Sequence, residues 1–152
     1  MAHPPRIPML LSEDKVATYF VTFCVADRLR VLANAECFSA FKSAAATVQR
    51  WEILAAVIMP DHIHALVCPK EPERSVGEFS RLIKRGMRLE LGVPWQWQAG
   101  CFDRLLRDDE SAQSKWEYMR ENPVRAKLVS DWQDWPFAIG IKEWSNNDSR
   151  TS

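Results

Sequence analysis

Two apolar, strand-like runs separated by a short break constrain the fold of this 152-residue chain more than any other feature. The first run extends from Trp51 to Met59, the second from His62 to Cys68, and Pro60-Asp61 lies between them. A break of this kind between two β-type runs predicts a hairpin. Because alternate side chains of a strand share a face, we expect His62 and His64 to point the same way while the residue between them points into the core.

Strand-like and helix-like segments alternate along the rest of the chain. We expect further strands at 19–25 and 102–106, and helices at about 35–50, 75–91 and 111–121. Ser75 followed by Glu78 predicts a capping box at the start of one helix. The order β-α-β-β-α-β plus a helix predicts an α+β fold with a ferredoxin-like (RRM-like) antiparallel sheet. Two helices would cover one face, a C-terminal helix would carry Tyr118, and the histidines would project from a free second face.

Length and composition fit one domain, which we place at residues 1–144, followed by a disordered tail at 145–152. The chain is 47% hydrophobic and 26% charged, which is typical of a soluble globular protein. No apolar stretch approaches the roughly 20 residues of a membrane span, and the N-terminus lacks the pattern of a signal peptide. The four cysteines are scattered, which predicts reduced, mostly buried thiols in a cytoplasmic protein.

Three side-chain types in this pattern indicate a possible active site. Two imidazoles side by side on a strand can hold a divalent metal. Asn122 lies one helical turn beyond Tyr118, so we expect both on the same helix face. Such a set could cleave a phosphodiester through the phenol. Ordinary structural roles stay open: surface histidines, a half-buried tyrosine, and Asn122 as the N-cap of a short helix that begins at Pro123.

Basic and aromatic residues follow the histidines in the sequence. The net charge is zero, which argues mildly against a nucleic-acid partner, but the positive charges are unevenly distributed. The candidate DNA-binding residues are Arg81, Lys84, Arg85, Arg88, Trp95, Trp97, Arg104, Arg107 and Arg125. A basic groove beside exposed aromatic rings suits single-stranded nucleic acid. A basic stripe on a helix is also often a simple solvated face.

Four segments carry a resemblance to a known family: Tyr19-Phe20-Val21-Thr22-Phe23 with Asp27-Arg28, 57–67 around the histidines, 97–107, and 118–129. In these segments the chain resembles the REP-associated tyrosine transposases, which are single-tyrosine HUH endonucleases. The resemblance extends roughly from Tyr19 to Phe137. Two residues depart from the family pattern: Asp61 stands where Asn is usual, and Lys127 stands where Gly is usual and could change the local turn.

The resemblance implies a metal-dependent endonuclease and strand transferase, a transposase that cuts single-stranded DNA beside hairpin repeats. Its implied cofactor is Mg²⁺ or Mn²⁺, held by His62, His64 and Asn122, although imidazole is an unusual ligand for Mg²⁺. Tyr118 would be the nucleophile, leaving a 5′-phosphotyrosine and a free 3′-hydroxyl. We expect a cytoplasmic, nucleoid-associated monomer or weak homodimer with no membrane partner.

One alternative keeps the fold but not the chemistry. The chain could be a non-catalytic or domesticated regulator that binds hairpin DNA or RNA. The glycine-and-aromatic strand motif of an RRM is absent, and the paired histidines would then have no task. Replacing Tyr118 by Phe separates the two hypotheses, because only an enzyme loses cleavage while it keeps hairpin binding.

Overall fold

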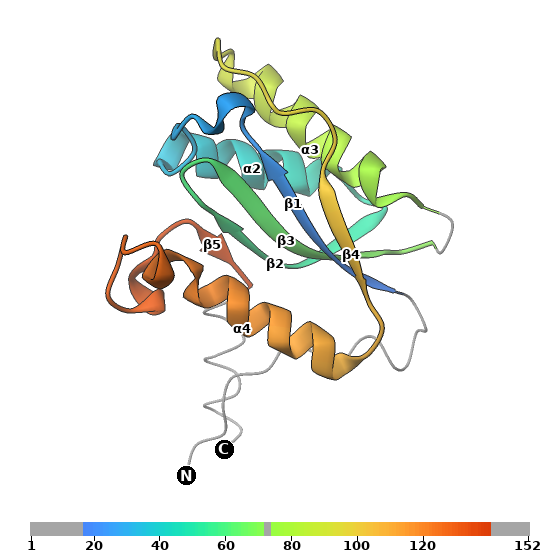
Figure 1. The fold of residues 1–152 in the computed structure, drawn as a ribbon. Coiled ribbons are helices and arrows are strands. Elements are labelled where there is room, and N and C mark those ends of the chain that lie inside the picture. The colour runs from blue at the N-terminus through green and yellow to red at the C-terminus, as the bar shows by residue number, and fades with distance from the viewer. Residues whose placement is uncertain (1–16, 72–73, 141–152) are drawn as a thin grey trace.

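The computed structural model describes residues 17–71 and 74–140, which form a five-stranded antiparallel sheet with helices packed on both faces (Figure 1). In chain order the elements are β1 (Thr18–Cys24), the 3₁₀ helix η1 (Ala26–Arg28), α2 (Ala35–Thr47), β2 (Trp51–Ile58), β3 (His62–Pro69), α3 (Val76–Leu91), β4 (Phe102–Leu106), α4 (Asp109–Arg125), the 3₁₀ helix η2 (Trp132–Asp134) and β5 (Ala138–Ile139). The strands lie in the order β4-β1-β3-β2-β5. The predicted α+β class and the element order β-α-β-β-α-β followed by a helix are confirmed.

The boundary of the predicted domain and its tail are not tested. Residue 144 and the segment 145–152 lie outside the described residues, so both stay predictions. Within the described ranges, no helix combines the length and the apolar character that a membrane span needs. Cys24, Cys37 and Cys68 are buried, as the sequence predicts, and Cys101 is partly exposed.

The predicted hairpin of β2 and β3 is present and fixes which face each histidine occupies. The Met59 amide donates to the His62 carbonyl at 2.8 Å, which closes the turn. Val57 pairs with His64, and Ile58 pairs with Ile63. Since paired residues of antiparallel strands point to the same side, Val57 and His64 share one face of the sheet while Ile58 and Ile63 share the other.

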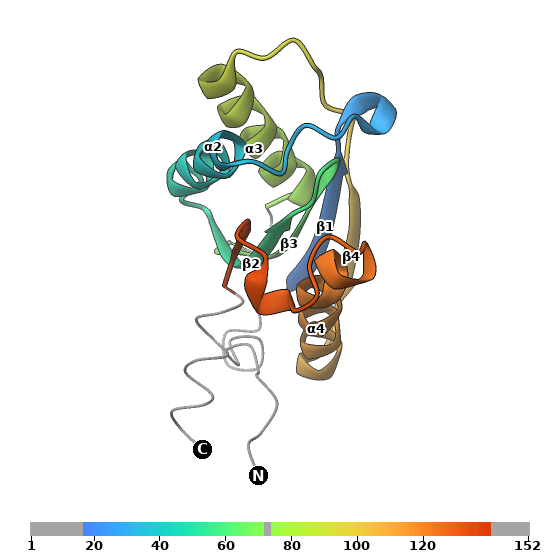
Figure 2. The same ribbon diagram turned by 90° about the vertical axis from the view of Figure 1, so that its left-hand side faces the viewer.

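The face that carries Ile63 packs against α2 and α3 (Figure 2). Phe41 of α2 and Ile83 of α3 are fully buried there, together with Phe23 of β1. The two helices approach each other closely at Gly86, where an added Cβ would lie 2.8 Å from the Cβ of Ala44. This half of the molecule is therefore a sheet covered by two tightly packed helices.

The opposite face is not free as the sequence suggested, because α4 covers part of it (Figures 1 and 2). Ala112, Trp116 and Met119 of α4 are fully buried and form an apolar stripe at helical spacing. They pack over Leu66 and Val57 of the sheet. Helix α4 buries this second apolar face of the sheet. The same helix places Tyr118 beside His64 of β3.

Helix α4 continues past the point where the sequence predicted its end. Pro123 lies inside the helix, so the interpretation of Asn122 as the N-cap of a new helix is wrong. Pro123 has no backbone N–H, but it lies in the last turns of α4, where the helix tolerates the loss of one hydrogen bond. The Lys127 amide donates to the Val124 carbonyl at 2.9 Å, and the Leu128 amide to the Pro123 carbonyl at 2.9 Å. This pair of bonds closes the helix in a Schellman arrangement.

Two smaller features also differ from the expectation. Ser75 caps α3 by accepting a hydrogen bond from the Gly77 amide at 3.1 Å, whereas a capping box would place Ser75 Oγ on the Glu78 amide. Strand β5 was not predicted, because two residues give no readable alternation. It pairs with β2 at Ala56 and Val57, and nearby the indole Nε1 of buried Trp135 donates to the Ile58 carbonyl at 3.1 Å.

Candidate active site

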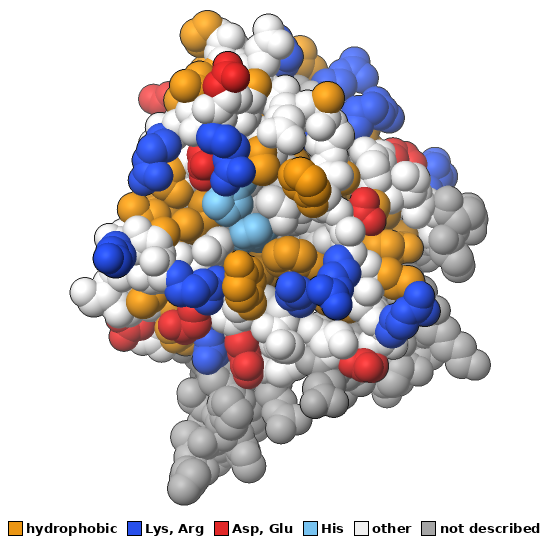
Figure 3. All heavy atoms as spheres, in the orientation of Figure 1, with side chains coloured by type: hydrophobic (Ala, Val, Ile, Leu, Met, Phe, Trp, Pro, Cys, Tyr) orange, Lys and Arg blue, Asp and Glu red, His pale blue; other side chains and the backbone are white. Residues whose placement is uncertain are grey.

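The two histidines of β3 lie side by side on the face that α4 partly covers. Their Nε2 atoms are 3.2 Å apart, and their ring centroids are 4.6 Å apart. In Figure 3 their side chains are visible near the centre of this face, bordered by hydrophobic and by Lys or Arg side chains. The sequence prediction that His62 and His64 share a face is confirmed.

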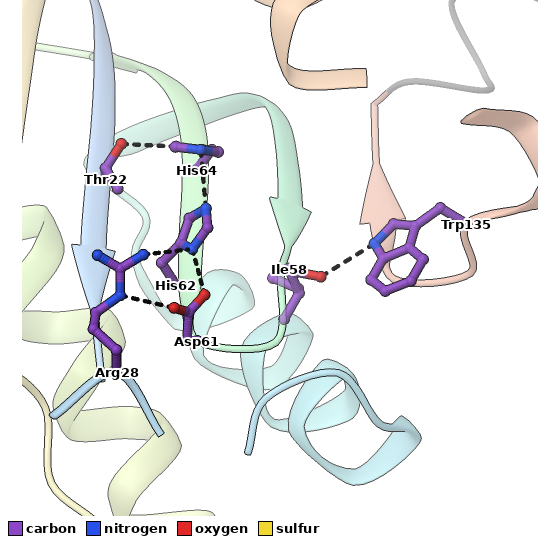
Figure 4. A network of polar contacts seen from close by, with 7 residues as sticks. All are labelled: Thr22, Arg28, Ile58, Asp61, His62, His64 and Trp135. Atoms are coloured by element: carbon purple, nitrogen blue, oxygen red, sulfur yellow. Dashed lines mark hydrogen bonds and ion pairs between the residues drawn. The ribbon is translucent and has the colours of Figure 1, made fainter. Parts of the chain in front are cut away.

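His62 is held by a carboxylate and a guanidinium (Figure 4). His62 Nδ1 lies 2.7 Å from Asp61 Oδ1, and Arg28 Nε donates to Asp61 Oδ2 at 2.8 Å. Burial raises the pKa of the Asp61 carboxyl, but the hydrogen bonds from His62 and Arg28 outweigh it, so the net pKa is lowered. An ionised carboxylate only accepts hydrogen bonds, so Nδ1 of His62 carries a proton and the lone pair of the neutral ring is on Nε2.

His64 is enclosed by β1. Thr22 Oγ1 lies 2.7 Å from His64 Nδ1, and the Phe20 ring stacks on the imidazole at 5.1 Å between centroids. Burial, with smaller contributions from His62, Arg125 and other cations, lowers the pKa of His64 to about 3. Burial also lowers the pKa of His62, against the opposing effect of Asp61. Both rings are thus held neutral, which is the form that binds a metal.

The donor set fits the expected divalent metal in part. Two nitrogens about 2.1 Å from one ion, in adjacent positions, lie roughly 3.0 to 3.4 Å apart, which agrees with the 3.2 Å between the Nε2 atoms. Within residues 17–71 and 74–140, no three His, Cys, Asp or Glu side chains are grouped to hold an ion. A third ligand would then be of another kind, such as an amide oxygen of the chain or an oxygen of a bound molecule.

Tyr118 of α4 lies beside the histidines. Its ring centroid is 6.5 Å from that of His64, and 47% of the residue is exposed. Two cations contact the ring: Arg125 with its guanidinium carbon 3.9 Å from the centroid, and Lys115 with Nζ at 5.2 Å. Arg125 also donates to the Tyr118 carbonyl at 2.5 Å. The phenol is therefore accessible, and two cationic side chains lie against its ring. Their positive charge favours the approach of an anionic group.

Asn122 lies one turn beyond Tyr118 within α4 and is half-buried. Its backbone carbonyl accepts from the Ala126 amide at 3.0 Å, as in a regular helix. Its assignment as the third metal ligand stays a prediction.

The basic residues of α3 lie across the sheet from the histidines, because α3 packs on the opposite face. Arg81, Arg85 and Arg88 are exposed. Lys84 differs from them: its ammonium group donates to the Gln98 carbonyl at 2.9 Å and to the Gly100 carbonyl, and burial lowers its pKa. This lysine therefore anchors the loop before β4, and the DNA contacts expected of all four residues stay predictions.

Trp95 and Trp97 are half-buried rather than freely exposed. Their rings contact each other at 5.1 Å between centroids, and Trp97 packs edge-on against Phe23 at 5.5 Å. Both pack against the core on the α3 side. Arg104 and Arg107, by contrast, are exposed on and just after β4, and with Lys115 they line a pocket of about 740 Å³ between β4 and α4.

Sequence reasoning missed several residues that surround the site. Thr22, Phe20 and Lys115 contact the histidines or the tyrosine. Phe20 and Thr22 lie in a segment that carries the family resemblance, but no role was assigned to them, and no short motif marks Lys115. Their positions depend on the pairing of β1 with β3 and on where α4 docks. Asp61 was recognised only as a departure from a family pattern, although a carboxylate next to a histidine is a readable signal for an imidazole partner.

No protein-family model matches the chain. A REP-associated tyrosine transposase of Escherichia coli is 26% identical over 127 residues, which cover 82% of this chain and 76% of the relative. A Haemophilus influenzae protein named as a candidate member of the same family is 27% identical over 144 residues, with 82% and 80% covered. The resemblance to the REP-associated tyrosine transposases is confirmed.

Solved structures agree on the fold. A REP-associated tyrosine transposase bound to a REP hairpin superposes with a TM-score of 0.71 at 22% identity, over 91% of this chain and 81% of that one. A candidate transposase from Deinococcus radiodurans gives a TM-score of 0.50 at 21% identity, over 70% and 90%. At these identities the superpositions establish the shared fold.

Both departures from the pattern of the REP-associated tyrosine transposases have a structural account. Asp61 supplies a charged acceptor for His62 and an ion pair with Arg28. Lys127 adopts a φ of 63°, the left-handed conformation that favours glycine. The turn after α4 therefore keeps the conformation suited to Gly, and the side chain at position 127 is accommodated under strain.

Proposed function

We propose that this chain is a transposase-type enzyme that cleaves and rejoins single-stranded DNA beside hairpin repeats, through a covalent bond to Tyr118. The observation that carries the proposal is the approach of the exposed Tyr118 ring to His64, 6.5 Å between centroids, across two segments 54 positions apart. An ordinary surface tyrosine has no reason to lie beside two neutral imidazoles, one buried and one partly buried, whose Nε2 atoms converge.

The proposed reaction uses the phenol as nucleophile. Tyr118 Oη gives up its proton to solvent as it attacks the phosphorus, the bond to O3′ breaks, and the departing oxygen takes a proton from solvent as a 3′-hydroxyl. The DNA 5′ phosphate stays on the tyrosine, so the 3′-hydroxyl of another strand can reverse the step without ATP. A Mg²⁺ or Mn²⁺ ion held by His62, His64 and Asn122 would polarise the scissile phosphate.

The chain's own residues support this chemistry in two ways. Asp61 and Thr22 contact the Nδ1 atoms of His62 and His64, which fixes the two rings with their Nε2 atoms together. Lys115 and Arg125 place positive charge against the Tyr118 ring. This charge would stabilise the negative charge that develops on a phosphate attacked by Tyr118. The hairpin partner is proposed from the relative that was solved with a REP hairpin.

The test is to incubate the chain with labelled single-stranded DNA that spans a hairpin repeat, with Mn²⁺, Mg²⁺ or EDTA, and to separate the products under denaturing conditions. We expect a metal-dependent protein–DNA adduct in the wild type and none in Tyr118→Phe, because the variant lacks the nucleophilic oxygen. Hairpin binding by Tyr118→Phe should stay within about two-fold of the wild type.

Tyr19→Phe is the matched control, because Tyr19 and Tyr118 are the two tyrosines of the chain. Tyr19 lies on β1 and packs against the core on the α3 side, away from the histidines. This variant should form the adduct normally. Hairpin binding without any adduct in the wild type would favour the non-catalytic regulator instead.

A further inference from the structure

Phe102 is an unexplained aromatic residue next to the candidate active site. It begins the edge strand β4, and 64% of the residue is exposed. Most of its surface is therefore open to contact with a ligand. Phe102 pairs with Thr22 of β1, and Thr22 in turn pairs with His64 of β3.

The register places Phe102 on the histidine face. Thr22 contacts His64 through its side chain, so Thr22 points to that face, and its partner Phe102 must point the same way. Two strand spacings separate the backbones of Phe102 and His64, or about 10 Å. Phe102 therefore lies beside the histidine pair at a distance suited to a neighbouring nucleotide.

A basic pocket lies further along β4 from Phe102. Arg104 pairs with Phe20, which stacks on His64, so Arg104 also lies on the histidine face. The pocket of about 740 Å³ between β4 and α4 is lined by Arg104, Arg107 and Lys115 among others. Lys115 Nζ lies 4.9 Å from the Phe20 centroid and 5.2 Å from the Tyr118 centroid, so this lysine connects the pocket to the tyrosine.

Asp108 offsets only part of the positive charge of the described residues that line the pocket. Asp108 caps α4 by accepting from the Ser111 amide at 2.7 Å, so its carboxylate is engaged by the helix end. Three cations remain in the lining, together with the hydroxyls of Ser111 and Ser114. Positive charge beside an exposed aromatic ring is the combination that binds single-stranded nucleic acid, with phosphates on the cations and a base on the ring.

We infer that Phe102, Arg104 and Lys115 form a nucleotide subsite beside Tyr118, in which the base next to the scissile phosphate stacks on Phe102. Arg104 and Lys115 contact the phosphates on either side of that nucleotide, and Arg107 extends the track along the pocket. This inference rests on the proposed function, because it assigns the path of the strand that Tyr118 attacks.

The test measures binding separately from cleavage. In the Tyr118→Phe background, Phe102→Ala should weaken binding of a fluorescent, hairpin-free oligonucleotide by roughly five-fold or more, as expected for the loss of one stacked base. Phe102→Trp should restore the affinity. Leu89→Ala is the matched control, since Leu89 is 75% exposed on α3, across the sheet. Fluorescence anisotropy gives the dissociation constants.

Abasic substitutions then locate the stacked base. Removing the base at one position of the oligonucleotide should abolish the difference in affinity between the Tyr118→Phe parent and its Phe102→Ala variant. Removing a base at any other position should leave that difference unchanged. Equal affinities of Phe102→Ala and the parent at every position would overturn the subsite. Because binding is measured without the nucleophile, a failure of adduct formation in the wild type would be seen separately and would bear only on the proposed chemistry.

Discussion

The orientation of His62 depends on Asp61 and Arg28. Arg28 reaches Asp61 from a tight turn in which Asp27 and Arg28 both adopt left-handed φ angles, of 59° and 53°. Such angles cost roughly 1–2 kcal/mol for most residues other than glycine, here Arg28, and less for an aspartate such as Asp27. Strain of this kind persists where the surroundings fix the conformation and is concentrated at functional sites. The strained turn, the carboxylate and the imidazole therefore form one positioning unit.

We predict that Asp61→Ala weakens Mn²⁺ binding by roughly 10- to 100-fold, because His62 loses the acceptor that orients its ring. Asp61→Asn keeps an oxygen in the same place and should lose less affinity. Titration of Mn²⁺, followed by electron paramagnetic resonance at neutral pH without DNA, measures the effect. Asp103→Ala removes an exposed carboxylate of β4 as a control. Wild-type affinity in Asp61→Ala would show that Asp61 does not position the ligand.

One helix contact and one helix end each depend on a single backbone position. Helices α2 and α3 approach at Gly86 and Ala44, and Lys127 adopts a left-handed conformation just after the end of α4. The helix contact requires a residue without a side chain at position 86. The turn at Lys127, by contrast, has a side chain where glycine would be less strained. Each makes a prediction of opposite sign for the free energy of unfolding.

Gly86→Ala should lower the free energy of unfolding by about 1–2 kcal/mol. The new Cβ would lie 2.8 Å from Ala44 Cβ, and overpacking of this kind costs about 1–3 kcal/mol, which the better helix propensity of alanine offsets only partly. Urea denaturation measures the change. Gly77→Ala in the same helix is the control, since its Cβ would meet only Ser75 Oγ at 3.4 Å. Equal stability of Gly86→Ala and wild type would mean that the helices can move apart freely.

Lys127→Gly should raise the free energy of unfolding by about 1 kcal/mol, because glycine adopts a positive φ without the clash of a Cβ. Its greater freedom in the unfolded chain limits the gain. Lys127→Ala removes the charge but keeps the Cβ, so it should leave stability nearly unchanged. A gain of the same size in Lys127→Ala would assign the effect to charge and not to backbone strain.

For the whole molecule, the sequence predicted the elements better than their arrangement around the site. Alternation and turn residues predicted β1 to β4 closely, and the shared face of His62 and His64 followed from strand periodicity. The docking of α4 on the second face could not be predicted, because it depends on which apolar stripes meet in three dimensions. For the same reason the contacts of Thr22, Phe20 and Lys115 with the site were missed. The alternative role of Asn122 as the N-cap of a new helix was considered because the sequence does not show that α4 continues through Pro123.

The two faces of the sheet also divide the charges of the molecule. The arginines of α3 lie on one side, and Arg104, Arg107, Lys115 and Arg125 lie on the side of Tyr118. A net charge of zero therefore conceals a basic surface around the candidate nucleophile.

The central claim is that Tyr118 forms the covalent bond, and mass spectrometry of the adduct tests it most directly. The wild-type chain is reacted with the hairpin oligonucleotide and Mn²⁺, the DNA is trimmed by nuclease, and the peptides are sequenced. We predict a single modified peptide, with the residual nucleotide attached through its 5′ phosphate to Tyr118. A nucleotide on Tyr19 or on any other residue, or cleaved DNA without a modified peptide, would contradict the account.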